Sequence, residues 1–133
     1  MMHPLIDDIL ICSKDGKNLT KFLYDDDFDP NLLSSLCSAL NIHIKEATGS
    51  ELNAVEIGEF KFSFFPCLDN NVLIVVKTAK KVKDKPIKKL FKVVVDIFEE
   101  MFTIEDIENW NGEKELFEKF QDKLNLYFKL SQL

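Results

Sequence analysis

Residues 72–76 read Val-Leu-Ile-Val-Val, and all five of these positions are apolar. Residues 9–12, Ile-Leu-Ile-Cys, form a second run without a polar side chain. A strand that is apolar on both sides lies in the interior of a sheet whose two faces are both covered. The two runs therefore predict two central strands, near 5–13 and 71–78.

Three further segments alternate between apolar and polar residues, as half-buried strands do. They are residues 18–24, 53–58 and 60–66. Asp15-Gly16 lies between the first two predicted strands and is a strong hairpin signal, because glycine accepts the positive φ of such turns. In strand 18–24, strict alternation places Leu19 and Leu23 opposite Thr20. The alternating strands are expected toward the edges of the sheet.

Helical periodicity occurs in three segments, near 30–47, 86–102 and 113–130. Pro30 and Pro86 suit the first position of a helix, where the missing N–H costs nothing. Thr103 followed by Glu105 and Asp106 resembles a further helix start. No linker divides this order of elements, so residues 1–133 are predicted to form one domain, with a core of about 5–102 and an extra helical segment over 103–133.

The chain has 133 residues and a mass of 15.4 kDa, which is enough for one domain. Twelve Phe provide the material for a real core and exclude intrinsic disorder as the main state. The longest apolar run has five residues, far short of the roughly 20 that a membrane-spanning helix needs. The first residues contain neither a basic region nor an apolar signal segment, so we expect a cytoplasmic protein.

The sequence contains no pattern typical of an enzyme, and we predict no catalytic residue, no cofactor and no metal site. Its four glycines are isolated, so no glycine-rich loop is present to hold a nucleotide phosphate. The acidic run at 25–29 lacks the glycine and glutamate that a calcium loop requires at its sixth and twelfth places. Cys12, Cys37 and Cys67 form no C-x-x-C pair and are interpreted as buried apolar side chains.

Charge is distributed unevenly along the chain, whose net charge is -6. All 17 basic residues are lysine, which excludes bidentate recognition of phosphate by arginine. Residues 77–92 contain eight Lys and one Asp, whereas the remainder has nine Lys and 22 acidic residues. A nucleic-acid binder would be basic overall, so nucleic acid is not expected as a partner.

The lysine-rich stretch has two interpretations, a solvated surface or a contact with an acidic partner or an anionic membrane. The lysines assigned to such a contact are Lys77, Lys80, Lys81, Lys83, Lys85, Lys88 and Lys89.

The order of the elements resembles that of the longin-like domains and of the related roadblock domains. The opening hairpin around Asp15-Gly16 and the motif Phe28-x-Pro30-x-Leu32-Leu33-Ser34-x-Leu36-x-x-Ala39 are similar to the passage from strand to helix in small longin-like proteins. Those relatives occur beside Ras-like GTPases in archaea related to eukaryotes. The resemblance implies an α+β fold in which a five-stranded antiparallel sheet, in the order 2-1-5-4-3, lies between one helix and C-terminal helices.

The resemblance also implies a function without catalysis. Longin-like proteins are subunits of trafficking complexes, or platforms that bind small GTPases and their regulators. The partners implied here are a small GTPase, its regulator or another longin or roadblock subunit, with a homodimer and peripheral membrane contact as open alternatives. The first helix and the edge of the third strand would form the interface. Its candidate residues are Ser34, Ser35, Ser38, Asn41, Val55 and Ile57.

Two other classes of function stay open. Related five-stranded folds enclose small molecules, and a sensor domain of this kind would use Phe60, Phe62 and Phe64 to line a cavity. In a scaffold the same three side chains would pack solidly. A profilin-like cytoskeletal binder ranks lower, because profilins begin with a helix and this chain begins with a predicted strand.

Overall fold

The structure is a computed structural model, and it describes residues 4–23 and 54–132. Its strands are β1 (Asp8–Ser13), β2 (Asn18–Leu23), β3 (Ala54–Ile57), β4 (Phe60–Cys67) and β5 (Val72–Ala79). Its helices are α2 (Asp84–Met101), α3 (Ile104–Glu108) and α4 (Glu115–Leu130). The helix predicted at 30–47 lies outside the described residues.

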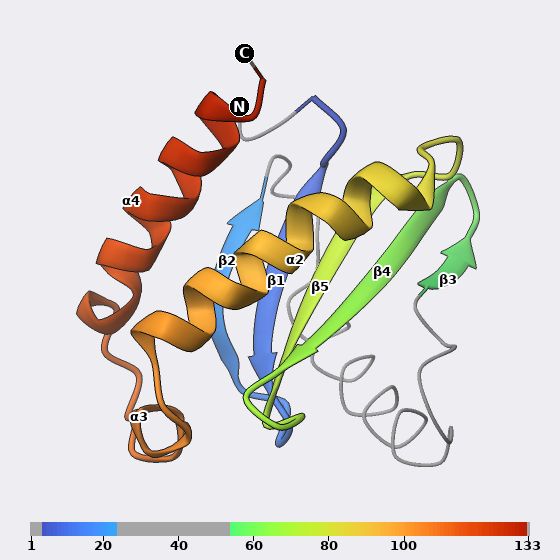
Figure 1. The fold of residues 1–133 in the computed structure, drawn as a ribbon. Coiled ribbons are helices and arrows are strands. Elements are labelled where there is room, and N and C mark those ends of the chain that lie inside the picture. The colour runs from blue at the N-terminus through green and yellow to red at the C-terminus, as the bar shows by residue number, and fades with distance from the viewer. Residues whose placement is uncertain (1–3, 24–53, 133) are drawn as a thin grey trace.

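The five strands form one antiparallel sheet in the order β2-β1-β5-β4-β3 (Figure 1). β1 pairs with β5 at the centre, where Ile9 lies opposite Val76 and Ile11 opposite Ile74. Every residue of β1 is buried. The prediction that the two fully apolar runs are the central strands is confirmed.

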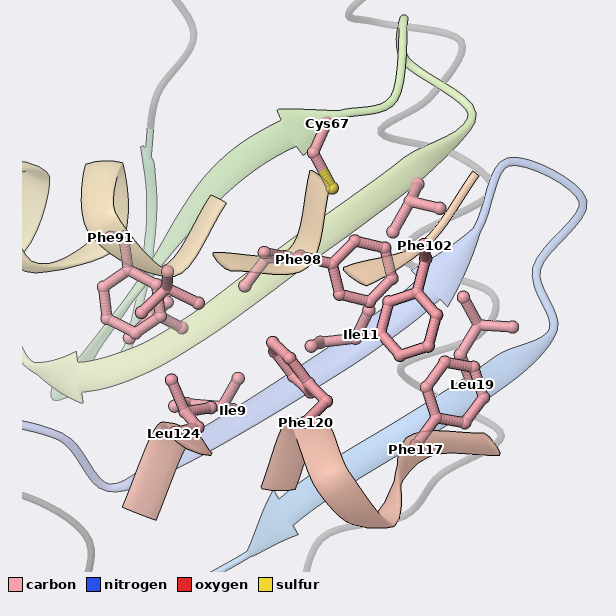
Figure 2. Close-up of a cluster of buried hydrophobic side chains, with 14 of the residues drawn as sticks. Ile9, Ile11, Leu19, Cys67, Phe91, Phe98, Phe102, Phe117, Phe120 and Leu124 are labelled. Carbon is pink, nitrogen blue, oxygen red and sulfur yellow. The ribbon is translucent and has the colours of Figure 1, made fainter. Parts of the chain in front are cut away.

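The larger core lies between one face of the sheet and the three described helices. α2 crosses the sheet, and α4 runs along its β2 side (Figure 1). Phe91 and Phe98 from α2 and Phe117 and Phe120 from α4 are at most 1% exposed. Phe98 meets Phe120 edge to face at a centroid distance of 5.2 Å, a favoured arrangement for aromatic pairs (Figure 2). This aromatic layer fixes both helices on the sheet.

A second and smaller group of buried side chains lies on the opposite face of the sheet. It consists of Leu10, Cys12, Phe62, Phe64, Leu73 and Val75, with Val55 packed against it. β4 is buried on both faces, since Lys61 and Ser63 alternate with Phe62 and Phe64 and all four are buried. The expectation of an alternating, half-exposed strand is therefore wrong for β4, which lies one strand inside the edge.

Two local expectations are corrected by the structure. The pairing of β1 with β2 shifts register between Ile11 and Cys12, and this irregularity places Leu19 in the larger core while Thr20 also contacts α4. Leu19 and Thr20 therefore do not face opposite sides, because a bulge breaks the alternation. Helix α2 begins at Asp84 and not at Pro86. Pro86 still lies in the first helical turn, where N–H groups have no partner in the helix.

Candidate interaction surfaces

β3 is the last strand of the sheet and the shortest. It pairs with β4 along one side, with Val55 opposite Phe62 and Ile57 opposite Phe60. Its other side has no partner strand among the described elements, and such an edge offers its backbone groups to another chain. Val55 and Ile57 thus lie on the edge strand where the interface was predicted. The other four interface residues, Ser34, Ser35, Ser38 and Asn41, lie outside the described residues.

The predicted lysine surface divides into two parts. Lys77 is half-buried in β5, where its Nζ lies 3.6 Å from Asp8 Oδ2 and 4.0 Å from the centroid of Phe60. Lys80 Nζ lies 3.4 Å from Glu56 Oε2, and both of those side chains are more than half exposed. The remaining five lysines of the prediction are exposed on the loop before α2 and on its first turns. They are Lys81, Lys83, Lys85, Lys88 and Lys89.

A buried lysine, Lys61, lies beneath this surface and was not predicted from the sequence. Lys61 has a side chain only 7% exposed, and its ammonium group donates to the carbonyl oxygen of Val82 and to Asp84 Oδ1 at 2.6 Å. The hydrogen bond from Lys61 is the main cause that lowers the pKa of Asp84 below its ordinary value of 3.8. Lys61 thereby fixes the start of α2 on β4. This role could not be predicted from the sequence, because it depends on the burial of both faces of β4 and on the position of α2 above it.

A groove about 430 Å³ in volume lies between β2 and the beginning of α4. Its walls include Lys21 from the strand and Trp110, Phe117 and Gln121 from the helical side. Gln121 Nε2 donates to Thr20 Oγ1 at 2.6 Å and so joins the two walls. The sequence did not predict this groove, because it depends on how α4 packs against β2.

Within residues 4–23 and 54–132, no three His, Cys, Asp or Glu side chains are placed to hold a metal ion. Cys12 and Cys67 are buried, as predicted. Burial is the main cause that raises the pKa of Cys67 to about 12, and the negative charge of Glu99 is the second cause. A thiol with this pKa is protonated and unreactive near neutral pH. Cys37 lies outside the described residues.

Phe60, Phe62 and Phe64 distinguish a sensor from a scaffold. Phe62 and Phe64 are 7% and 2% exposed and pack within the smaller buried group, whereas Phe60 is 37% exposed at the end of the strand. The groove beside β2 is lined by none of these three side chains. The packing of Phe62 and Phe64 favours the scaffold interpretation, and Phe60 follows neither expectation.

Among the helices of the described residues, none combines the length and the hydropathy needed to cross a bilayer.

The architecture defines a class of protein. A five-stranded antiparallel sheet in the order 2-1-5-4-3, with C-terminal helices on one face, is the longin-like roadblock fold. Among solved structures, the chain is similar to Myxococcus xanthus MglB, a roadblock/longin-domain protein, with a TM-score of 0.54 and 18% sequence identity. The similarity covers 71% of this chain and 85% of MglB, and it confirms the predicted fold. No protein-family model and no curated protein sequence matches the chain.

Proposed function

We propose that this protein is a non-enzymatic interaction scaffold, a longin-like subunit or platform for the regulation of a small GTPase or for membrane trafficking. The observation that carries the proposal is the open edge of β3 in a sheet of longin-like order. Its partners would be a small GTPase, a regulator of such a GTPase or another longin or roadblock subunit. The proposed location is the cytoplasm, with peripheral contact to membranes.

The partner surface in this proposal is the outer side of β3 together with the segment containing Ser34, Ser35, Ser38 and Asn41. An incoming strand could pair with the side of β3 that no strand of the described residues occupies, and main-chain hydrogen bonds would supply affinity. Val55 would provide an apolar contact, because it is only partly buried against the smaller group of side chains. A homodimer through the same edge would use the same contacts.

The exposed lysines before and at the start of α2 have a separate role in the proposal. They would attract an acidic protein surface or an anionic membrane and raise the rate of encounter. Because these side chains are exposed, salt would screen the attraction at distances beyond a Debye length, which is about 8 Å at physiological ionic strength. Added salt is therefore expected to weaken this contact more than the contact at β3.

The test is a binding measurement with purified small GTPases from the same genome, each loaded with GDP or with a non-hydrolysable GTP analogue. Val55→Lys should weaken binding at least about tenfold, because it places a charge in an apolar contact. Leu126→Lys is the matched control, since Leu126 is 57% exposed on α4, away from β3. Circular dichroism should show that both variants are folded.

Two results would contradict the proposal. One is unchanged binding in Val55→Lys while Lys80→Glu and Lys81→Glu abolish it, which would place the interface on the lysines. The other is micromolar binding of GTP by the isolated chain, because the proposal assigns the nucleotide to the partner. Isothermal titration calorimetry measures the second directly.

A further inference from the structure

Charged residues on the exposed side of α2 are separated by sign. The first half carries Lys85, Lys88, Lys89 and Lys92, and the second half carries Asp96, Glu99 and Glu100. A helix dipole favours acidic side chains near the first turn and basic ones near the last, so most of these charges oppose it. Only Asp84 in the first turn follows the rule, and the last turn has no basic residue. The stability of the isolated helix does not explain this arrangement.

Two of the pairs along the helix point the same way, whereas Asp84–Lys88 and Lys92–Asp96, at the same spacing, are of opposite charge. Lys85 and Lys89 stand four positions apart, as do Asp96 and Glu100, and like charges at this spacing destabilise a helix. All four side chains are exposed, and among the described residues no ion pair involves any of them. Glu99 differs, because its carboxylate accepts a hydrogen bond from the backbone N–H of Leu68 at 3.1 Å.

The four charges lie on one stripe of the helix. Successive residues turn by 100°, which places Lys85, Lys89, Asp96 and Glu100 within about 60° of one another. The buried residues Ile87, Phe91, Val94 and Phe98 occupy the opposite side. The stripe also borders Val93, a large apolar side chain that is 38% exposed on this helix.

The stripe is complementary to itself when one copy is reversed. The point midway between Lys92 and Val93 is equally distant from Lys85 and Glu100, at about 11 Å along the axis, and from Lys89 and Asp96, at about 5 Å. A second α2 placed antiparallel about this point would bring each lysine opposite an acid. Val93 of each copy would lie near the two-fold axis on one side of the stripe and Lys92 of each copy on the other side, since an isologous interface uses the same patch of both copies.

We propose that the exposed stripe of α2 binds the α2 stripe of a second copy of this chain in an antiparallel, two-fold pair. An anionic membrane lying along α2 would attract Lys85 and Lys89 but repel Asp96 and Glu100, and the same holds for a uniformly acidic protein. The reversed copy satisfies these four charges, whereas Lys92 of each copy lies beside its own equivalent at the edge of the stripe. This interface is independent of the β3 edge and of a GTPase partner, and it assigns Lys85 and Lys89 to a second copy in place of the acidic partner or membrane proposed above.

The experiment is an exchange of charges measured by sedimentation equilibrium at about 50 mM salt, in a Val55→Lys background that removes association through β3. One variant carries Lys85→Glu and Lys89→Glu, and the other carries Asp96→Lys and Glu100→Lys. Each variant alone should associate at least about tenfold more weakly, because like charges then face each other. An equimolar mixture of the two should form a heterodimer at least as stable as the parent pair.

The matched control for the first variant is Lys119→Glu with Lys123→Glu on α4, which makes the same change in net charge as that variant but at exposed positions outside α2. It should leave association unchanged, and about 0.5 M salt should weaken the parent pair. The proposal is overturned if the parent is monomeric at about 1 mM or if the mixture stays monomeric. It is also overturned if the first variant loses binding to phosphatidylserine vesicles while its self-association is unaltered.

Discussion

The two edges of the sheet differ in what protects them. β2 lies beside α4, and its residues contact that helix through Leu19 in the larger core and through the hydrogen bond between Gln121 and Thr20. β3 has only four residues, and no described helix packs along its outer side (Figure 1). Natural sheets cover an edge, charge it or keep it short so that it does not pair with other chains.

Aromatic side chains of the helical layer lie beside the covered β2 edge. Phe117 contacts Phe102 at 5.2 Å and Trp110 at 5.5 Å between ring centroids, all within the helical layer beside β2. On the β3 side, the connection between sheet and helices includes the polar contact of Lys61 with Asp84. The first edge contributes to stability, and the second is the one to which the proposed function assigns binding.

The largest expected effect is on stability at the β2 edge. Phe117→Ala should lower the free energy of unfolding by about 3–5 kcal/mol, because Phe117 is 1% exposed and its removal leaves a cavity. Val55→Ala on β3 should cost about 1 kcal/mol or less, since this side chain is only partly buried. Denaturation by urea measures both. Equal losses would mean that the two edges do not differ in this way.

A smaller effect is expected at the polar contact near β3, and it should depend on pH. The folded state lowers the pKa of Asp84, mainly through the hydrogen bond from Lys61, so the contact stabilises the fold above the ordinary value of 3.8. The stabilisation is lost as pH falls through the lower, folded value. Asp84→Asn should therefore cost about 1 kcal/mol at pH 7, a figure reduced by the 60% exposure of its side chain, and progressively less as pH falls below 3.8.

Glu56→Gln is the control for that measurement. It removes the contact between Glu56 and Lys80, whose side chains are both more than half exposed. The free energy of unfolding should therefore change by less than about 0.5 kcal/mol. A cost in Asp84→Asn that persists unchanged at acidic pH would show that the carboxylate charge is not involved.

The smallest effect concerns the single hydrogen bond across the β2 groove. A double-mutant cycle with Thr20→Val and Gln121→Ala should give a coupling of about 0.5–1.5 kcal/mol, the usual net contribution of a hydrogen bond. Urea denaturation of the four proteins measures it. Additive losses would indicate that the groove walls are held by apolar packing alone.

Much of the fold could be predicted because its signals are local. Val72–Val76 is apolar throughout, and that alone indicates a central strand. Thr103 was recognised as a helix start, and the structure shows a capping box in which its hydroxyl accepts from the Asp106 N–H and its own N–H donates to the Asp106 carboxylate. The bulge between Ile11 and Cys12 could not be predicted, because it is a property of strand pairing.

The candidate surfaces were less accessible to prediction. Val55 and Ile57 could be assigned to an edge because the strand order implied by the longin resemblance places the third strand last, whereas the apolar pattern alone places only the first and fifth strands at the centre. Lys77 is partly buried beside Asp8, a residue distant from it in the sequence, and no local sequence pattern indicates this contact. The same is true of Lys61, whose partners Val82 and Asp84 are reached only once β4 lies beneath α2.

The central pairing of β1 with β5 also has a kinetic consequence. Ile9 meets Val76, 67 positions later in the chain, so the middle of the sheet forms only after a long loop has closed. Closing such a loop costs entropy before any contact rewards it, and folds rich in distant contacts fold slowly. During synthesis, the apolar faces of the β1–β2 hairpin would stay exposed, and accessible to chaperones, until β5 has been made and pairs with β1.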